Sequence, residues 1–244
     1  MTRAESLAQA RRVIHRIVAE RHDRPSLVPR IASEIGAEIV EGHIPPGHDL
    51  NTVDLARRYQ TSRTPVREAL LLLDREGLVD LPPRRRPTAH VHTIQDVREA
   101  YTTRTVIFEL IATEVAERAG EREIAMLEQV LTYMRQAVER GDPTAFTWLS
   151  VHFHEIETRI SGNRTAKRIH DSLLLRMLAI RRLAIAQPGR LAQSMEDHVQ
   201  LVKAYSGGQA HLAGAIMRAS HIASREAIEL YHENGGALVA PSAP

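Results

Sequence analysis

Cysteine is absent from this chain of 244 residues, and aromatic residues make up only 4% of it. Without cysteine the chain can form neither a disulfide nor a thiolate metal site, which fits a reducing cytoplasm. With few aromatics, the core must consist mainly of Leu, Ile, Val and Ala. No run of eighteen apolar residues exists, and Arg11, Arg12 and Arg16 interrupt the apolar residues near the start. We therefore expect a cytoplasmic protein without a membrane span or signal peptide.

The charge of the chain is unevenly distributed, although the net charge is only +2. Residues 1–92 contain more Lys and Arg than Asp and Glu, whereas the remainder is slightly acidic. Two arginine clusters stand out: Arg57, Arg58, Arg63 and Arg67, with no acid between them, and Arg84, Arg85 and Arg86. Such clusters neutralise phosphates locally even when the total charge is small. Either cluster alone is equally compatible with an exposed, solvated face.

The first part of the chain shows a series of short helical patterns. Apolar spacing predicts helices over 4–22, ended by His22 to Pro25, and over 27–41, followed by Gly42. After a turn at Ile44 to Gly47, we expect Thr52 to cap a short helix that reaches Tyr59.

A longer helix, capped by Ser62 or Thr64, should run from there to about Gly77. Residues 78–81 and 89–91 then resemble two short strands joined by a loop rich in Pro and Arg.

The second part of the chain reads as consecutive helices with short links. Thr93 and Asp96 have the spacing of a helix-capping pair. Glycine and proline mark the breaks between the following helices, which indicates an all-α bundle. The expected helices are 94–119, 121–140, 143–160, 164–186, 190–206 and 209–234, and the tail 237–244 is expected to be disordered.

Two short helices, a tight turn and a small two-stranded wing form an arrangement that reads duplex DNA, with the second helix in the major groove. Arg63 and Arg67 are one turn apart and can share a face, and arginine can donate two hydrogen bonds to guanine. Ser62 and Thr64 can donate hydrogen bonds to phosphate. The apolar positions of the same helix should pack inward: Val66, Ala69, Leu70 and Leu73.

The unbroken stretch Ser62-Arg-Thr-Pro-Val-Arg-Glu-Ala-Leu70, with Ile44-Pro-Pro-Gly before it and Glu76-Gly-Leu-Val79 after it, resembles the GntR family of bacterial transcription regulators. The resemblance implies DNA contacts by Ser62, Arg63, Thr64 and Arg67, with a wing contact near Arg84 or Arg85. Two departures leave the base preference open. Many members have glycine at the wing tip, where this chain has Pro and Arg, and some have arginine where Val53 stands.

Residues 95–232 resemble, more weakly, the helical ligand-sensing (FCD-like) domain of the FadR-type branch of this family. The motifs that carry this likeness are Tyr101-Thr-Thr-Arg104, Phe153-His154, His198 after an acid, and Ser224-Arg-Glu-Ala-Ile228. Many such domains hold a divalent metal such as zinc or nickel through one Asp and three His, and the metal then receives the effector carboxylate.

The match to that ligand set is incomplete. His154 and His198 fit, but Ser150 stands where Asp is expected, and Ser220 stands where the last His is expected, with His221 one residue later. Because one residue rotates a helix position by about 100°, His221 is expected to point away from the pocket. Two alternatives remain. Either His154, His198 and His221 hold a metal, or His154, His198 and Arg104 bind an anionic ligand directly without one.

Arg104 has no acid within four residues on either side, so it needs an anion or a salt bridge to a neighbouring helix. Phe108 stands where family members commonly have Glu, and Glu109 is displaced. His152 should face away from His154. Three other histidines are interpreted as surface or edge residues: His170, His211 and His232.

The sequence thus predicts a mainly α protein, with an N-terminal winged helix-turn-helix and a C-terminal all-α six-helix bundle. The expected divisions are a helical extension over 1–26, a DNA-binding domain over 27–92, a ligand-sensing and dimerisation domain over 93–236, and the tail 237–244. We expect a homodimeric regulator, not an enzyme, that binds double-stranded DNA at a pseudo-palindromic operator, most often as a repressor, under control of a small carboxylate or other anionic metabolite. The competing hypotheses are a metal-dependent enzyme using His154, His198 and His221, and a structural DNA-binding protein.

Overall fold

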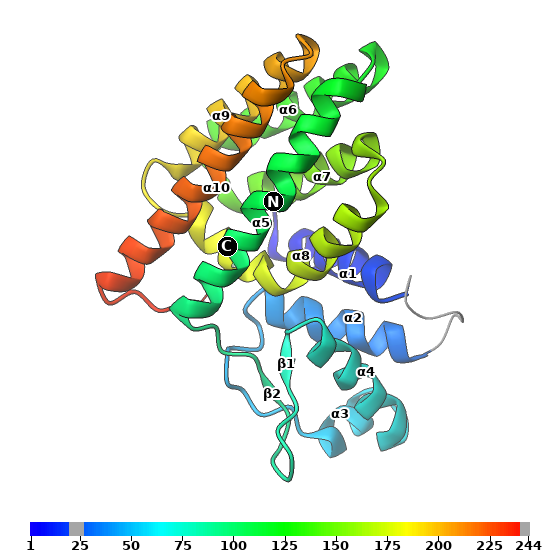
Figure 1. Cartoon of the computed structure of the whole chain (residues 1–244). Helices are drawn as coiled ribbons and strands as arrows, with labels where there is room; N and C mark the ends of the chain where they lie inside the picture. Colours follow the sequence, from blue (N-terminus) through cyan, green and yellow to red (C-terminus); the bar gives the residue numbers. More distant parts are fainter. Residues whose placement is uncertain (20–26, 240–244) are drawn as a thin grey trace. The chain divides into compact units, whose positions relative to one another are not determined.

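The computed structural model describes residues 1–19 and 27–239 and is mainly α-helical (Figure 1). The chain divides into two compact units, one formed by Thr2–His92 together with Leu174–Ala179, the other by Thr93–Leu173 and Ile180–Leu238. The first unit contains α1 (Arg3–Ala19), α2 (Leu27–Val40), α3 (Thr52–Arg58), α4 (Arg63–Arg75), β1 (Val79–Asp80) and β2 (Thr88–Ala89). The second is built from α5 (Ile94–Arg118), α6 (Glu121–Glu139), α7 (Pro143–Ser161), α9 (Arg190–Ser206), α10 (Ala210–Glu233) and the parts of α8 (Arg164–Ile185) outside residues 174–179.

In the first unit, α2 packs against both α1 and α4 (Figure 1). Gly36 of α2 lies at the crowded point of this packing. A Cβ added there would be 3.0 Å from Cδ2 of Leu73 and 3.2 Å from Cδ1 of Ile14. The missing side chain therefore allows the three helices to approach closely. The predicted break at His22 to Pro25 lies outside the described residues.

The turn between α3 and α4 follows from local capping. The backbone N–H of Val53 donates to Oδ1 of Asn51 at 2.9 Å, so the cap of α3 is Asn51, and the prediction of Thr52 was wrong by one residue. An asparagine that already accepts from the second helical N–H leaves Thr52 as the first helical residue. Gln60 then reverses the chain with φ 51°, and α4 begins directly after Ser62.

The wing is an antiparallel pair in which Val79 faces Ala89 and Asp80 faces Thr88. Both strands are shorter than predicted, because the prolines at positions 82, 83 and 87 have no N–H to extend the ladder. At the loop between them, Arg84 has φ 61°, in the left-handed region that glycine tolerates best. Arg84 therefore adopts a conformation favoured by glycine, in the loop where the family resemblance predicts a glycine.

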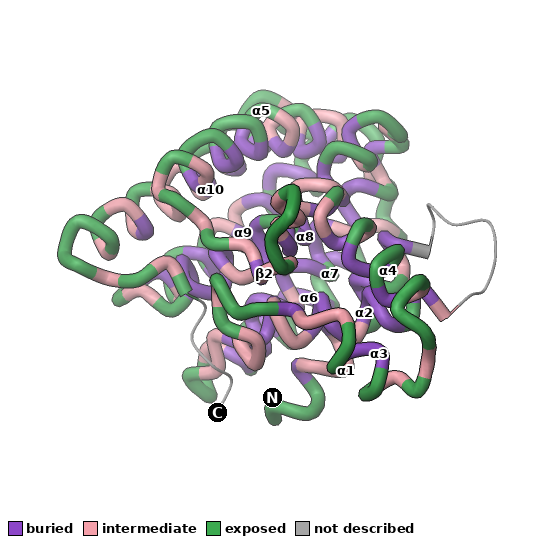
Figure 2. The backbone as a smooth tube through the Cα atoms, turned by 90° about the horizontal axis from the view of Figure 1, so that it is seen from below, coloured by how far each residue is buried: buried purple, intermediate pink, exposed green. Residues whose placement is uncertain are grey.

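The six helices of the second unit begin and end within one residue of their predicted bounds. Capping explains the agreement: Thr93 and Asp96 form the predicted reciprocal cap, and Asp142 and Asn163 cap α7 and α8. Helices α5 and α10 lie side by side, and buried and exposed residues alternate around them at helical spacing (Figures 1 and 2). The core includes Phe108, Ile111, Leu127, Phe146, Phe153 and Tyr205.

The predicted mainly α fold with a two-stranded wing is confirmed. Among residues 1–19 and 27–239, no helix combines the length and the apolar character needed to cross a bilayer. The tail prediction concerns residues that, from 240 onward, lie outside the described part.

Candidate nucleic-acid interface and effector cavity

Helix α4 has one buried and one exposed face, as predicted. Val66, Ala69, Leu70 and Leu73 are buried, whereas Ser62, Arg63, Thr64 and Arg67 are exposed. Ser62 stands at the N-cap position, but its side chain accepts no hydrogen bond from the first turn of α4. The first N–H groups of α4 therefore remain available to an external acceptor such as a phosphate oxygen.

Pairing separates the arginines of this unit into two groups. Arg57, Arg58 and Arg86 form ion pairs with Asp54, Glu38 and Asp49. In the described part of the chain, no carboxylate pairs with the four arginines predicted to touch DNA: Arg63, Arg67, Arg84 and Arg85. The four arginines that are predicted to contact DNA thus lack a carboxylate partner within the described part of the chain.

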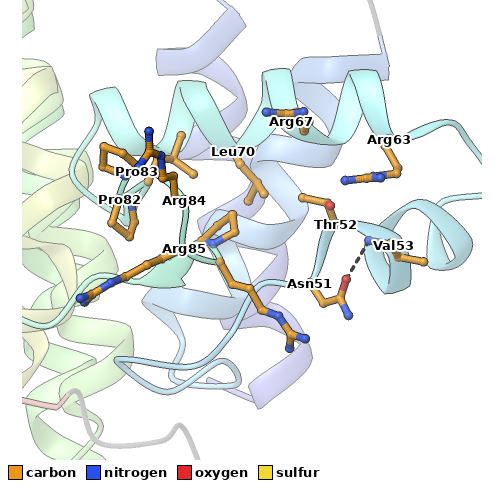
Figure 3. Close-up of a pocket in the computed structure, with 13 residues that line it drawn as sticks. Asn51, Thr52, Val53, Arg63, Arg67, Leu70, Pro82, Pro83, Arg84 and Arg85 are labelled. Carbon is orange, nitrogen blue, oxygen red and sulfur yellow. Dashed lines mark hydrogen bonds between the residues drawn. The ribbon is translucent and has the colours of Figure 1, made fainter.

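The unpaired arginines surround one groove of about 680 Å³ between α3, the start of α4 and the wing loop. Arg63 and Arg67 reach it from α4, and Arg84 and Arg85 from the wing (Figure 3). Five arginines and no acidic residue line the groove. Val53 also lines it and is 46% exposed, so the position where some family members have arginine faces the same space. The groove therefore concentrates positive potential at the predicted DNA contacts.

A second, much smaller cavity of about 30 Å³ lies inside the helical unit, among α5, α7, α8, α9 and α10. All four predicted effector or metal residues line it: Arg104, His154, His198 and His221. Ser150 and Ser220, the two departures from the family's ligand set, line it as well.

The side chain of Arg104 is almost completely buried, at 1% exposure. Its guanidinium carbon lies 4.2 Å from the centre of the Phe108 ring, and neither Nη1 nor Nη2 has a hydrogen-bond partner among the described residues. The alternative of a salt bridge to a neighbouring helix is therefore not realised. Phe108, at the position where family members commonly have Glu, supplies a ring face, and Glu109 pairs with Arg218 instead.

Arg181 of α8 lines the same cavity and was not found from the sequence. Its Nη2 donates to Oγ of Ser150 at 2.8 Å, while Nη1 has no partner in the described structure. The signal was present in the sequence, because Arg181 follows Leu174, Met177 and Leu178 on one helical stripe. An arginine on an apolar stripe indicates a buried cation.

The three cavity histidines come from α7, α9 and α10. The ring centre of His154 is 5.7 Å from that of His198 and 6.2 Å from that of His221. His198 donates from Nδ1 to the backbone carbonyl of Ser194 at 2.6 Å, which leaves Nε2 as the free nitrogen. His154 shares a hydrogen bond of 2.6 Å with Glu157, whose other oxygen accepts from the Tyr205 hydroxyl at 2.5 Å.

Two predictions about histidines were wrong. His221 does not point away from the cavity, because it lies four residues after Met217 and shares its buried face on α10. His170 is not a surface residue: it is 2% exposed and its ring centre is 4.9 Å from that of Phe108. His211 and His232 are exposed as predicted, and His152, predicted to face away from His154, is exposed while His154 is buried.

Burial without an anion disfavours every charge in the cavity. Desolvation lowers the pKa of Arg181 to about 10 and that of His198 to about 4. It also holds the pKa values of Arg104, His154 and His221 well below their usual ranges, with Arg181 adding repulsion to each. Desolvation raises the pKa of Glu157 to about 8, so its carboxyl is largely protonated at neutral pH. The ligand-free cavity therefore lacks negative charge.

The residues do not fit a divalent metal ion. Metal sites of this type combine imidazoles with a carboxylate, and here Ser150 replaces the carboxylate and accepts from a guanidinium. The nearby acids are engaged elsewhere: Asp197 accepts from Ser220, and Glu157 bonds to His154 and Tyr205. In the described ranges, no group of three or more His, Cys, Asp or Glu is arranged to hold a metal ion.

Both units of the chain match known protein families. Residues 27–87 match the family described as bacterial regulatory proteins, gntR family, and residues 99–223 match the FCD domain. The chain belongs to the GntR family, in the branch that carries an FCD domain.

Individual relatives agree with this assignment. The HTH-type regulator YdhC of Bacillus subtilis is 33% identical over 132 residues, which are 54% of this chain and 59% of that protein. A probable D-xylose utilization operon transcriptional repressor of Paenarthrobacter nicotinovorans is 26% identical over 89% of this chain and 95% of its own length. The structure of Escherichia coli McbR/YncC covers 87% of this chain and 100% of its own, with a TM-score of 0.69 and 21% identity, and supports the fold.

This GntR-family chain is a ligand-responsive DNA-binding transcription regulator. Its winged helix-turn-helix presents the arginine-lined groove at the predicted DNA contacts, and its FCD domain encloses the cavity lined by the predicted effector residues. The metal-dependent enzyme and the structural DNA-binding protein find no support in these relatives.

Proposed function

We propose that this regulator is a repressor that binds a pseudo-palindromic operator as a homodimer, and that a small anionic metabolite in the FCD cavity controls its DNA affinity. The role of repressor is suggested by the named function of the Paenarthrobacter relative. The observation that carries the DNA-binding part is the set of unpaired arginines around an acid-free groove.

The proposed DNA contacts divide into two kinds. Arg63 and Arg67, exposed on one face of α4, are placed for base edges and phosphates of the major groove. Ser62, Thr64 and the first N–H groups of α4 bind phosphate and fix the helix in register. Arg84 and Arg85 extend the contact to the wing side. A homodimer presents two copies of α4, which requires half-sites separated by about one helical turn or a multiple of it.

The buried cations of the cavity support the proposed control by an anion. Arg104 has two unpartnered guanidinium nitrogens at 1% exposure, and burying a charge without a partner is unfavourable. An anion that satisfies these donors stabilises one arrangement of the FCD helices over others. By linkage, the factor by which the anion changes DNA affinity equals the factor by which DNA changes anion affinity. We assign no catalytic role to the cavity, because the named relatives are transcription regulators.

The experiment is selection of binding sites from random duplex DNA by the full-length protein, followed by fluorescence anisotropy on the selected site. We expect a two-fold related consensus and saturation on single sites at physiological salt. Arg67→Ala should lose about 1–3 kcal/mol of binding and relax preference at one base position. Arg75→Ala is the matched control, because it removes one exposed charge from the far end of the same helix. No preference over scrambled DNA would refute sequence-specific regulation, and a single monomer per site by light scattering would refute the homodimer.

A further inference from the structure

Three guanidinium nitrogens inside the FCD cavity have no partner among the described residues: Nη1 and Nη2 of Arg104 and Nη1 of Arg181. Arg104 is 1% exposed and Arg181 is 7% exposed, so water does not replace the missing acceptors freely. His221 contributes one further unpartnered nitrogen, Nδ1, to the same space. The guanidinium donors of the two arginines therefore lack acceptors inside the cavity.

The position of Arg181 is a second observation that points to an anionic ligand in this cavity. The likeness to metal-binding FCD domains calls for an Asp at position 150, but Ser150 stands there and its Oγ accepts from Nη2 of Arg181 at 2.8 Å. A guanidinium is therefore bonded to the residue that would have held the metal. A permanent cation next to the three histidines repels a second cation, and it offers the positive charge that a metal would otherwise offer to a ligand.

We propose that Arg181 takes the place of the metal: the carboxylate of a small organic acid binds directly between the guanidinium groups of Arg104 and Arg181, without a metal ion. Ser150 acts as a positioning residue that holds one edge of Arg181. This inference rests on the proposed control by an anion, and it names the chemistry of the effector and the residues that recognise it.

The choice of a carboxylate follows from geometry and size. A guanidinium donates two parallel hydrogen bonds that match the two oxygens of a carboxylate. The cavity is only about 30 Å³, so the bound group must be small. Leu201, Met217 and Ile185 line the rest of the wall and suit a short carbon chain. The lowered pKa of both arginines agrees with a site that lacks its anion.

The first test uses the full-length protein after treatment with a chelator, with metal content measured by elemental analysis. Thermal unfolding is followed with acetate, malonate or succinate, against sodium chloride at equal ionic strength. We expect a concentration-dependent rise of Tm with at least one carboxylate, equal with and without chelator. Stabilisation that needs added zinc or nickel, or none beyond that of chloride, would overturn the proposal. Phosphate is the comparison anion, and stabilisation by phosphate alone would overturn the assignment to a carboxylate.

Substitutions of Arg181 test whether this residue binds the carboxylate. Arg181→Gln should weaken binding of the stabilising carboxylate by about tenfold or more, because it removes a charged hydrogen-bond donor. Arg181→Lys should recover part of this affinity, because it restores the charge without the planar fork. Arg168→Gln is the matched control: Arg168 is exposed on the same helix, and its loss should leave the affinity unchanged. Equal affinities in all four proteins would place the ligand elsewhere.

Ser150→Asp restores the carboxylate that is expected at this position in metal-binding FCD domains. Alone, it gives Arg181 an internal carboxylate, so we expect a higher Tm for the ligand-free protein and weaker binding of the carboxylate. Combined with Arg181→Leu, it assembles one carboxylate and three histidines, and binding of zinc or nickel should appear. Metal binding by the single Ser150→Asp variant as tight as by the double variant would show that Arg181 does not exclude a metal, and would overturn the proposal.

The DNA-binding assay separates this inference from the proposed function. If a chelator abolishes the effect of the carboxylate on DNA affinity while specific DNA binding persists, the direct arginine site is wrong and the regulator stands. If the protein binds DNA without sequence preference but still binds the carboxylate in the presence of a chelator, the regulator is wrong and the arginine site stands.

Discussion

Substitutions of Arg84 in the wing loop should affect the stability of the protein and its affinity for DNA in opposite directions. Arg84 has φ 61°, a left-handed conformation that disfavours residues with a Cβ by about 1–2 kcal/mol. Arg84→Gly removes this strain. Glycine also gains freedom in the unfolded chain, which offsets the gain by about 0.5–1 kcal/mol. We expect a net increase of about 0.5–1 kcal/mol in the free energy of unfolding, or roughly 2 °C in Tm for a chain of this size.

The same change should weaken DNA binding, because Arg84 lines the groove and has no internal carboxylate partner. Each phosphate contact contributes about 0.9 to the slope of log K against log salt, so a homodimer with two wings should lose about 1.8. Thermal unfolding and fluorescence anisotropy over a salt series measure the two effects.

Three control variants isolate the cause. Arg84→Ala keeps the strained conformation and loses the charge, so it should match Arg84→Gly in DNA binding without the gain in stability. Arg85→Ala should weaken binding at unchanged Tm. Arg86→Ala removes an arginine that is already paired with Asp49, and it should change the salt slope least. If Arg84→Gly and Arg84→Ala have equal Tm values, the backbone at Arg84 is not strained, and the reasoning fails.

Other predictions concern the core and the cavity. Arg104→Met should raise the free energy of unfolding by about 1–2 kcal/mol while abolishing carboxylate binding, because it replaces an unpaired buried charge; a lower urea midpoint would contradict this. Glu157 has its pKa raised to about 8 by burial, so its neutral form stabilises the fold below about pH 4.5 in full, and this contribution is lost as pH rises through 8. Between about pH 7 and 8, where the cavity histidines are neutral in the folded and largely in the unfolded state, the urea midpoint of the wild type should fall with pH, and that of Glu157→Gln should not. Gly36→Val should destabilise the protein by about 2–3 kcal/mol, because even a Cβ at position 36 would lie 3.0 Å from Cδ2 of Leu73. An unchanged urea midpoint would contradict this, because it would show that α2 and α4 can move apart to accommodate the side chain.

The helix bounds of the FCD domain could be predicted because their determinants are local. The reciprocal cap of Thr93 and Asp96, the cap by Asn163 and the breaks at glycine act over a few residues, and all are visible in the sequence. The same locality explains the error at α3, where Asn51 and Thr52 are both good caps and only the backbone geometry decides between them.

The contents of the cavity were harder to predict, because they depend on which face of a helix is buried. The position of His221 was inferred from its offset to the family pattern, which gave the wrong face. The spacing of Ala213, Met217 and His221 would have placed it correctly. The pairing of Arg181 with Ser150 joins α8 to α7 across 31 residues, and no local rule anticipates such a contact.

The small volume of the FCD cavity bears on how sensitively the proposed effector site can respond. If the proposed effector is larger than the cavity of about 30 Å³, it binds only the fraction of molecules in which the helices have moved apart. The apparent dissociation constant is then the intrinsic one divided by that fraction. If about one molecule in a hundred is open, the threshold concentration rises about a hundredfold. Substitutions in the packing of α5 against α10, far from any ligand contact, could therefore adjust the metabolite level at which the operator is released or occupied.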